Sequence, residues 1–448
     1  MKWVALLLFM ASVPILIGWL RANPQRAPIV WTAMGFLPFV MDPWHLIIGP
    51  ISWAMWPGYV KGLELSLLDF VALAVFLRYQ NVHVPSPMLK ILPIYIGVVL
   101  TTMIYSGVPM AALFYAWQLA RVLLIFAAVS KICQDKRGAS ALIRGMVLGI
   151  CYQAGFSIDQ KLSGVTQASG TFGHQNLLGM ISHFVLFPAL AMLMVDGKQR
   201  APLYGVIAGA IVVIFGASRA TLGLAAFGFV TLLVLSIARK PTPRKSMIVG
   251  LGLVGLAVAA PLALSSLQER FEVAPISTDY DERAAFERAA RMMIADHPMG
   301  VGSNQYVVVA NTQGYSDRAG VVWNFGSRGA NVHNAYLLVW AETGFIGLAA
   351  FVLLLLTPIR LAFRTAWQNR KDPRGDLLLG LGVCLVVVVA HCFYEWIFVV
   401  YPVQVMFAMN AGMIAGLARQ ISVEKGLLAK SARQNELRPA VANGGEVA

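Results

Sequence analysis

The chain has 448 residues, of which 58% are hydrophobic and only 12% are charged, and its formal net charge is +14. A soluble protein of this length would form about three domains and carry roughly twice this share of charged residues. The charges are also clustered, and they leave apolar stretches long enough to cross a hydrocarbon layer of about 30 Å. This composition excludes a soluble enzyme, a disordered chain and a disulfide-stapled secreted domain. It indicates an all-α, polytopic membrane protein.

The basic residues gather in short segments between the apolar runs, for example around Lys136, Lys198, Lys240 and Arg370. This is the positive-inside pattern, which marks the cytoplasmic side of a membrane protein. No basic surface interleaved with aromatic residues accompanies it, so the positive charge does not indicate a nucleic-acid partner. The four cysteines lie in or beside apolar runs without metal-type spacing, and we interpret them as small core residues.

Apolar runs predict membrane-spanning helices along most of the chain. They fall at 3–20, 28–41, 44–60, 63–77, 91–106, 109–130, 139–157, 176–195, 201–216, 220–238, 246–266, 334–357, 376–394 and 397–418. Several prolines interrupt 28–60, so part of this Trp-rich segment is expected to lie in the interface instead of crossing. We therefore expect about twelve true spans. The predicted organisation is membrane helices over 1–266, a large loop over 267–332, membrane helices over 333–418 and a basic cytoplasmic tail over 419–448.

The loop over 267–332 is the only sizeable polar region of the sequence. Alternation of the spans from the basic segments places it on the side opposite the cytoplasm. A loop this long in a compact protein is typically functional or carries its own structure. Within it, 281–296 is predicted to be a helix, because Thr278 and Asp281 have the spacing of a capping box and Pro298 follows the end.

His333 lies where this loop returns to the membrane. Histidine can exchange protons near neutral pH, since its reference pKa is about 6.5. His333 is therefore a candidate general base. The alternative is an interfacial histidine that caps the following helix.

Two arginines lie at or near membrane depth, where a guanidinium is costly and marks a functional site by default. Arg219 follows one apolar run and precedes another, and its alternative role is to snorkel to the outer interface. Arg121 lies inside the run 109–130 and needs a partner. It either contacts substrate or locks helices together.

The predicted loop helix carries three arginines, Arg283, Arg288 and Arg291. Glutamates at helical spacing allow surface pairing for some of them. Arg283 falls in the predicted first turn, where a cation opposes the helix dipole, so an anionic partner explains it better. Asp279 and Asp281 have a spacing that can hold a divalent metal, but acids are also favoured at a helix start. We interpret this pair as a solvated helix terminus.

Several motifs around this loop resemble signatures of the O-antigen ligase and O-antigen polymerase superfamily. They are Thr171-Phe172-Gly173-His174-Gln175-Asn176; Gly216-Ala217-Ser218-Arg219-Ala220; Arg283 with Asp296-His297-Pro298-Met299-Gly300-Val301-Gly302; and His333-Asn334-Ala335-Tyr336-Leu337 with Glu342-Thr343-Gly344. The resemblance covers roughly 170–350. One departure is the His174-Gln175 pair before Asn176, where relatives often carry Asn-Pro.

The resemblance implies a bacterial inner-membrane enzyme with about twelve spans and a large periplasmic loop. Such proteins move a glycan from undecaprenyl diphosphate to an acceptor. Arg219 and Arg283 would be the essential arginines that stabilise the departing diphosphate, and His333 the essential histidine that takes the acceptor's proton. We expect further substrate contacts from Arg121, Asn176, Arg288, Arg291 and Asn334.

Direct attack opposite the diphosphate implies inversion at the anomeric carbon, and two arginines can replace a metal, so no metal or cofactor is expected. The favoured acceptor is the lipid A core, as for an O-antigen ligase. A polymerase and a protein O-oligosaccharyltransferase are the alternatives within the superfamily. A lipid-linked oligosaccharide transporter is an alternative of another class. A transporter typically places charges along a midplane pathway, whereas here they concentrate in one outer loop.

Overall fold

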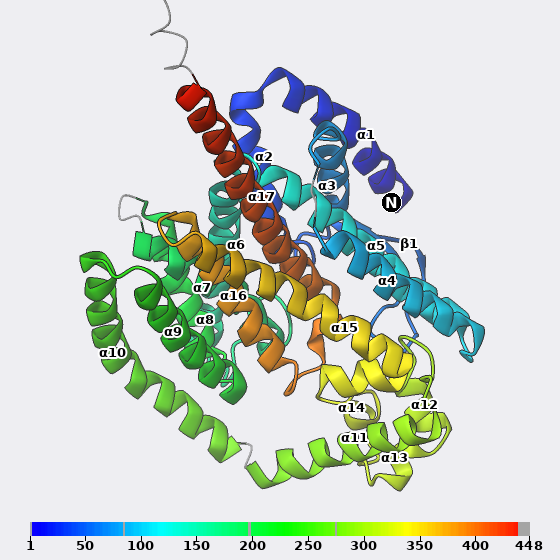
Figure 1. The fold of residues 1–448 in the computed structure, drawn as a ribbon. Coiled ribbons are helices and arrows are strands. Elements are labelled where there is room, and N and C mark those ends of the chain that lie inside the picture. Colours follow the sequence, from blue (N-terminus) through cyan, green and yellow to red (C-terminus); the bar gives the residue numbers. More distant parts are fainter. Residues whose placement is uncertain (1, 84–85, 196–198, 274–275, 438–448) are drawn as a thin grey trace, which may run out of the picture.

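The computed structural model describes residues 2–83, 86–195, 199–273 and 276–437, and most of them are helical (Figure 1). The bundle helices are α1 Lys2–Ala22, α2 Ala27–Phe36, α3 Leu67–Arg78, α4 Met88–Thr101, α5 Pro109–Ile132, α6 Gly138–Leu162, α7 Gln175–Val195, α8 Ala201–Phe215, α9 Arg219–Arg239, α10 Pro243–Val273, α15 Ala335–Gln368, α16 Arg374–His391 and α17 Tyr401–Leu437. This architecture confirms the predicted all-α membrane fold.

Eight of the described helices are long and apolar enough to cross a membrane, namely α1, α5, α6, α7, α9, α15, α16 and α17. Two shorter apolar helical segments, Met88–Ile104 and Ala201–Phe215, lie at further predicted spans. Burial separates the outer from the central helices, since 6% of the apolar window of α1 is buried, against 89% of that of α17. α17 runs through the bundle against α5, whereas α1 lies at its edge (Figure 1). The expected total of about twelve spans stays a prediction.

Residues 44–60 do not form the candidate span. They lead into and form part of an antiparallel hairpin of β1 Ile47–Ser52 and β2 Gly62–Ser66, with an irregularity in the register. Three prolines within 43–57 account for this, because proline lacks a backbone donor and clashes with the preceding turn of a helix. The prediction of a span here is therefore wrong, and the segment agrees with the alternative of a Trp-rich stretch that does not cross.

Four helices lie between α10 and α15 and form one end of the bundle, which we call the loop end. They are α11 Ile276–Asp296, α12 Tyr306–Thr312, α13 Tyr315–Arg318 and α14 Phe325–Arg328. α10 continues to Val273, past the predicted loop start at 267, because no glycine or proline lies between Pro261 and Pro275. α11 begins at Ile276, earlier than predicted. The side chains of Thr278 and Asp281, and with them the proposed capping box, lie outside the described residues.

Glu342, near the start of α15, anchors the loop helices to the bundle. Its buried carboxylate accepts hydrogen bonds from the backbone N–H groups of Asn304, Gln305 and Tyr306, at 2.8, 2.9 and 3.0 Å. N–H groups at the start of a helix such as α12 have no acceptor within the helix, so the carboxylate supplies one. A negative charge at this position also interacts favourably with the helix dipole. Tyr59, from the segment between the two strands, donates its hydroxyl to the same carboxylate at 2.6 Å.

Gly300 and Gly344 allow the backbone around 298–300 to pack directly against the backbone around 342–344, beside this anchor. Their φ angles are +88° and +67°, a region that side chains disfavour. A Cβ on Gly300 would lie 2.5 Å from the carbonyl oxygen of Glu342, and one on Gly344 would lie 2.6 Å from the carbonyl carbon of Met299. Both motif glycines are therefore required by packing.

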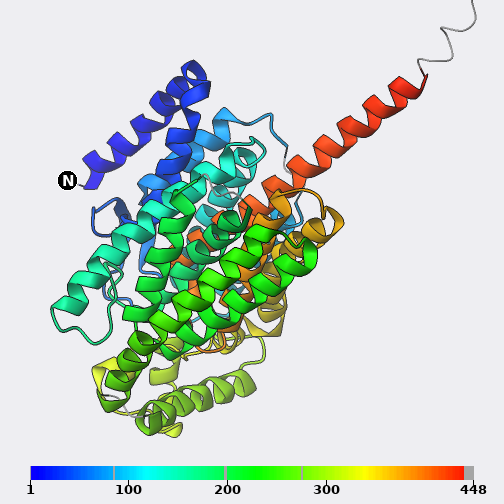
Figure 2. The same cartoon turned by 90° about the vertical axis from the view of Figure 1, so that its left-hand side faces the viewer.

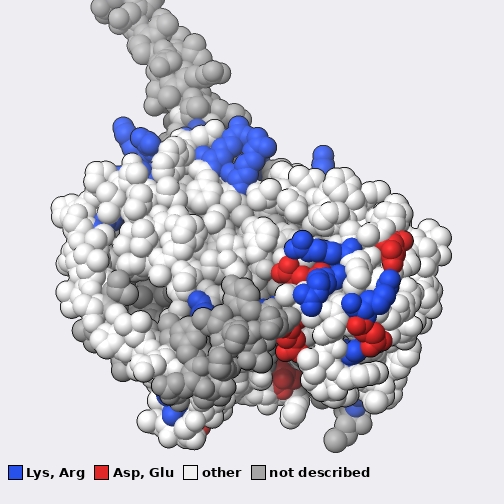
Figure 3. Space-filling model, turned by 90° about the horizontal axis from the view of Figure 1, so that it is seen from below, with Lys and Arg blue, Asp and Glu red and all other residues white. Residues whose placement is uncertain are grey.

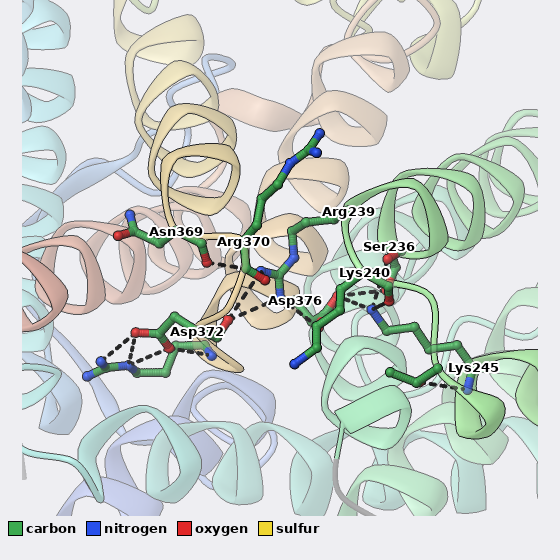
Figure 4. A network of polar contacts seen from close by, with 10 residues as sticks. Ser236, Arg239, Lys240, Lys245, Asn369, Arg370, Asp372 and Asp376 are labelled. Carbon is green, nitrogen blue, oxygen red and sulfur yellow. Dashed lines mark hydrogen bonds and ion pairs between the residues drawn. The ribbon is translucent and has the colours of Figure 1, made fainter.

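The opposite end of the bundle is held by a buried charged network around Asp376 (Figure 4). Asp376, at the start of α16, accepts hydrogen bonds from Arg239 at 2.8 Å, Lys245 at 2.9 Å and Ser236 at 2.7 Å. These partners come from the end of α9 and the start of α10, so the network joins three helices. At this end α17 continues as a helix to Leu437, beyond its predicted end at 418, and its last turns project from the bundle (Figure 2).

Candidate active site

A buried glutamate, Glu395, stands at the centre of a polar cluster at the loop end. His333 Nδ1 lies 3.2 Å from Glu395 Oε2. On the other oxygen, Arg283 Nη2 donates at 3.2 Å and Asn176 Nδ2 donates at 2.5 Å. Three predicted site residues from distant parts of the sequence thus meet on one carboxylate.

Backbone hydrogen bonds hold His333 and Glu395 against each other. The N–H of Ala335, the first residue of α15, donates to the carbonyl of Cys392, which follows α16, at 2.8 Å. The N–H groups of Tyr394 and Glu395 both donate to the carbonyl of His391, at 2.9 and 3.1 Å. The turn after α16 therefore places Glu395 next to His333, which lies two residues before the start of α15.

Helix α11 covers the cluster with one face. Arg283 and Phe286 are three residues apart, so they lie on the same side of this helix. Arg283 contacts Glu395 and also donates to the carbonyl of Tyr394 at 3.4 Å, while the ring of Phe286 stacks on His333 at a centroid distance of 5.8 Å. The side chain of Arg283 is 39% exposed and that of His333 is 22% exposed, so a ligand can reach both.

The charges around Glu395 favour its ionised form. Burial alone would raise the pKa of Glu395, but the hydrogen bond with His333 and the positive charges of His333 and Arg283 outweigh it, so the pKa lies below its ordinary value. Burial lowers the pKa of His174, which favours its neutral form, and His174 Nδ1 accepts the N–H of Asn176 at 3.2 Å. An ionised Glu395 favours a proton on Nδ1 of His333, so in the neutral imidazole Nε2 is the nitrogen that can accept a proton.

Arg219 is the first residue of α9 and is half-buried at the loop end. Ser218 caps this helix by accepting the N–H of Thr221. The turn before it is held by the segment that leads to α7, because the N–H of Ala168 donates to Phe215 and the Gln167 amide donates to Gly216 and Ala217. The fold thus carries Arg219 and Asn176 on adjoining segments. A contact of Arg219 with diphosphate stays a prediction.

The remaining predicted residues make structural contacts. Asn334 accepts the N–H groups of Tyr336 and Leu337, so it, and not His333, caps α15. Arg121 forms a buried ion pair with Asp69 at 2.9 Å and lies over the Tyr401 ring at 3.8 Å. This geometry supports its role in locking α5 to α3 and α17. A substrate contact by Asn334 or Arg121 stays a prediction.

The loop arginines divide into two kinds. Arg291 pairs with Glu287 at 3.0 Å on the surface of α11, and Arg288 donates to the carbonyl of Ala319 at 2.9 Å. Basic and acidic side chains lie interspersed on the face seen from the loop end (Figure 3). Arg283 differs because its partner is the buried Glu395. It lies in the third turn of α11, so the expectation of a first-turn position is wrong, although the expected anionic partner is present.

The alternative of a metal site at Asp279 and Asp281 concerns side chains that the structure does not describe. Among the described residues, no group of three or more His, Cys, Asp or Glu side chains lies close enough to hold a metal ion. The side chains of Asp279 and Asp281 are not among them. Metal independence therefore stays a prediction.

Glu395 is the site residue that sequence reasoning missed. It lies in Phe393-Tyr394-Glu395-Trp396, between two runs that were predicted as spans. A single acid between two membrane helices is itself a functional signal, because an ionised side chain in such surroundings is expensive. That signal was available in the sequence, but its partner could be identified only from the fold.

The protein is thus a helical membrane bundle with a His–Glu–Arg cluster at one end. Residues 204–352, about one third of the chain, match the O-antigen ligase family. This match confirms the resemblance to the O-antigen ligase and polymerase superfamily, and it supports a membrane enzyme of the glycosyltransferase type.

One curated relative is an uncharacterized protein of Haemophilus influenzae, which is 30% identical over 127 residues. The match spans 28% of this chain and 28% of that protein. It therefore covers only a minor part of either chain.

Proposed function

We propose that the protein is an inverting glycosyltransferase, an O-antigen ligase, which transfers O-antigen polysaccharide from undecaprenyl diphosphate to the lipid A core. The observation that carries this proposal is the contact of His333 and Arg283 with opposite oxygens of Glu395. A histidine, which can accept a proton, thus lies beside a partly exposed cation, and this supports the proposal because the transfer needs both kinds of group.

In the proposed reaction, Nε2 of His333 takes the proton of the acceptor hydroxyl as its oxygen attacks the anomeric carbon. Glu395 holds Nδ1–H and stabilises the imidazolium that forms. The bond between that carbon and the diphosphate oxygen breaks, and the pair of electrons leaves with the diphosphate. Arg283 and Arg219 stabilise this charge with the forked donors of their guanidinium groups. Attack opposite the leaving group inverts the anomeric carbon.

The acceptor is tested with purified protein in lipid nanodiscs and undecaprenyl diphosphate carrying the native glycan. The acceptors, offered separately, are the lipid A core, the lipid-linked repeat and a peptide. Transfer to the lipid A core supports the ligase. Transfer to the repeat or to the peptide would identify the polymerase or the O-oligosaccharyltransferase. Movement of the donor across a bilayer without a new glycosidic bond would favour the transporter instead.

The proposed location is the inner membrane of a Gram-negative bacterium, with the loop end facing the periplasm. Phe325, in α14, is 98% exposed and offers a reporter position as Phe325→Cys. In whole cells with a permeabilised outer membrane, a membrane-impermeant thiol reagent should modify it. Modification only after the inner membrane is breached would overturn this orientation. Cys151→Ser removes the one half-buried native cysteine, and the other three are buried.

A further inference from the structure

A cavity lies at the loop end of the bundle, next to the cluster around Glu395. Its volume is about 260 Å³. It is lined by residues between 38 and 64, around the β hairpin, by residues between 171 and 177, at the start of α7, and by residues 400–402, at the start of α17. Drug-sized ligand sites typically measure about 300–1,000 Å³, so this cavity fits one sugar ring and not an oligosaccharide.

Three charged side chains that line this cavity lack a hydrogen-bond or ion-pair partner within the described part of the chain. The carboxylates of Asp42 and Glu64 and the amine of Lys61 make no side-chain hydrogen bond or ion pair with any residue that the structure describes. Burial raises the pKa of Glu64, which is half-buried in β2. By contrast, the nearby Asp69 forms an ion pair with Arg121 and accepts the hydroxyl of Tyr401. Unpaired charges at a common cavity are available to a polar ligand.

Aromatic rings form the apolar walls beside these charges. Phe39 and Phe172 meet edge to face at a centroid distance of 6.5 Å, and Tyr59 lines the same cavity. Gln118 lies at the base, with its amide fixed on the carbonyl of Val399 at 2.8 Å. Rings that pack against C–H faces, beside carboxylate acceptors and an ammonium donor for hydroxyl groups, suit a carbohydrate.

The cavity adjoins the catalytic cluster through two chain segments. Leu177 lines it and directly follows Asn176, which donates to Glu395. Val400 lines it and belongs to the same connection between α16 and α17 as Glu395. A sugar bound here would therefore lie close to the segments that carry Asn176 and Glu395.

We infer that this cavity binds one sugar ring of the saccharide substrate through Glu64, Asp42 and Lys61. The inference rests on the proposed glycosyltransferase function and deepens it. The ring can belong to the donor glycan or to the acceptor, since the chemistry of recognition is the same for both.

The test compares Glu64→Gln and Lys61→Met with wild type and with Asp159→Asn, an exposed acid at the end of α6 outside the cavity. For each protein in nanodiscs, one measures the Kd of undecaprenyl diphosphate with and without the native glycan, the KM of donor and acceptor, kcat and the thermal midpoint. Loss of one charge-assisted hydrogen bond should weaken binding of one saccharide substrate about 10-fold. Binding of glycan-free undecaprenyl diphosphate and the Asp159→Asn values should stay within about twofold.

A weaker donor Kd assigns the cavity to the donor glycan, and a higher acceptor KM alone assigns it to the acceptor. Unchanged binding of both saccharides in the two cavity variants would overturn the inference while the transferase stands. Equal weakening of glycan-free undecaprenyl diphosphate would also overturn it, because the cavity would then serve the diphosphate. If wild type binds the glycan but transfers it to no acceptor, the proposed function fails and the cavity remains. Lys61 is exposed, so its variant tests the idea even if Glu64→Gln unfolds.

Discussion

Replacing Glu395 with glutamine tests whether this buried carboxylate organises the site. The side chain keeps its size but loses its charge, and one acceptor oxygen becomes an NH₂ donor. In the wild type, all three neighbours, His333, Arg283 and Asn176, approach Glu395 with nitrogen atoms. A glutamine cannot accept on both sides, so either Arg283 and Asn176 face its NH₂ group donor against donor, or His333 must change its tautomer.

The magnitude follows from the bond that changes during the reaction. A hydrogen bond to a charged group contributes about 1.5–3 kcal/mol, so losing the Glu395 contact with the His333 imidazolium should slow turnover about 10- to 150-fold. If the NH₂ group faces His333, it donates to Nδ1 and moves the ring proton to Nε2. The base is then lost, and the decrease approaches the about 10⁴-fold upper limit of general-base catalysis. The contact with Arg283 counts for less, because that side chain is 39% exposed.

The assay measures kcat at saturating donor and acceptor between pH 5 and 8. The matched control is Glu287→Gln, the same substitution at another carboxylate that pairs with an arginine of α11, but on the surface. Surface pairs contribute about 0–1 kcal/mol, so the control should be nearly silent. Because the pKa of Glu395 lies below its ordinary value, its charge persists above that ordinary value and is lost only as the pH falls through the lowered one. Glu395 therefore produces no limb between pH 5 and 8. Wild-type kcat in Glu395→Gln would refute this account.

Other substitutions separate the remaining roles. His333→Ala should lower kcat about 10²–10⁴-fold with donor binding retained; weaker donor binding would instead indicate a phosphate contact. Arg283→Ala and Arg219→Ala should each abolish transfer in a folded protein, with poor rescue by lysine because a point charge lacks the forked geometry; an active Arg283→Ala would exclude that residue. Transfer should survive EDTA, and restoration by added Mg²⁺ after inhibition would contradict the arginine mechanism. Asp376→Asn should lower the thermal midpoint, because it leaves buried cations unpaired, without changing KM; unchanged stability would contradict the role of this network.

Hydropathy and charge predicted the membrane helices because those signals depend on single segments. The long apolar runs became helices at nearly the predicted positions, and His333 lies at the predicted return of the loop. Hydropathy gave the wrong result where prolines prevent a helix in an apolar run, and where a helix continues into a polar sequence. The hairpin at β1 and β2 replaced an apolar span, and α10 extended beyond its apolar run to Val273.

Pairing across the fold could not be predicted in the same way. The three arginines of α11 have similar sequence surroundings, yet Arg291 faces its own helix neighbour and Arg283 faces Glu395, 112 residues later. What decides between them is the position of the turn after α16. That position depends on backbone contacts such as the one between Ala335 and Cys392, which no periodicity reveals.

The motifs that resemble one family therefore serve two physical purposes. His333 and Arg283 present nitrogen atoms to a buried carboxylate and to the open side of the site, which is an arrangement for chemistry. Glu342, Gly300 and Gly344 instead fix the loop helices to α15, through a carboxylate that caps α12 and two glycines at a crossing without room for a Cβ. Tyr306, in the anchored α12, donates its hydroxyl to the carbonyl of Phe286 in α11 at 3.1 Å, so the anchor helps to position the helix that carries Arg283. A motif residue can thus be required for the geometry of the site without belonging to the cluster around Glu395.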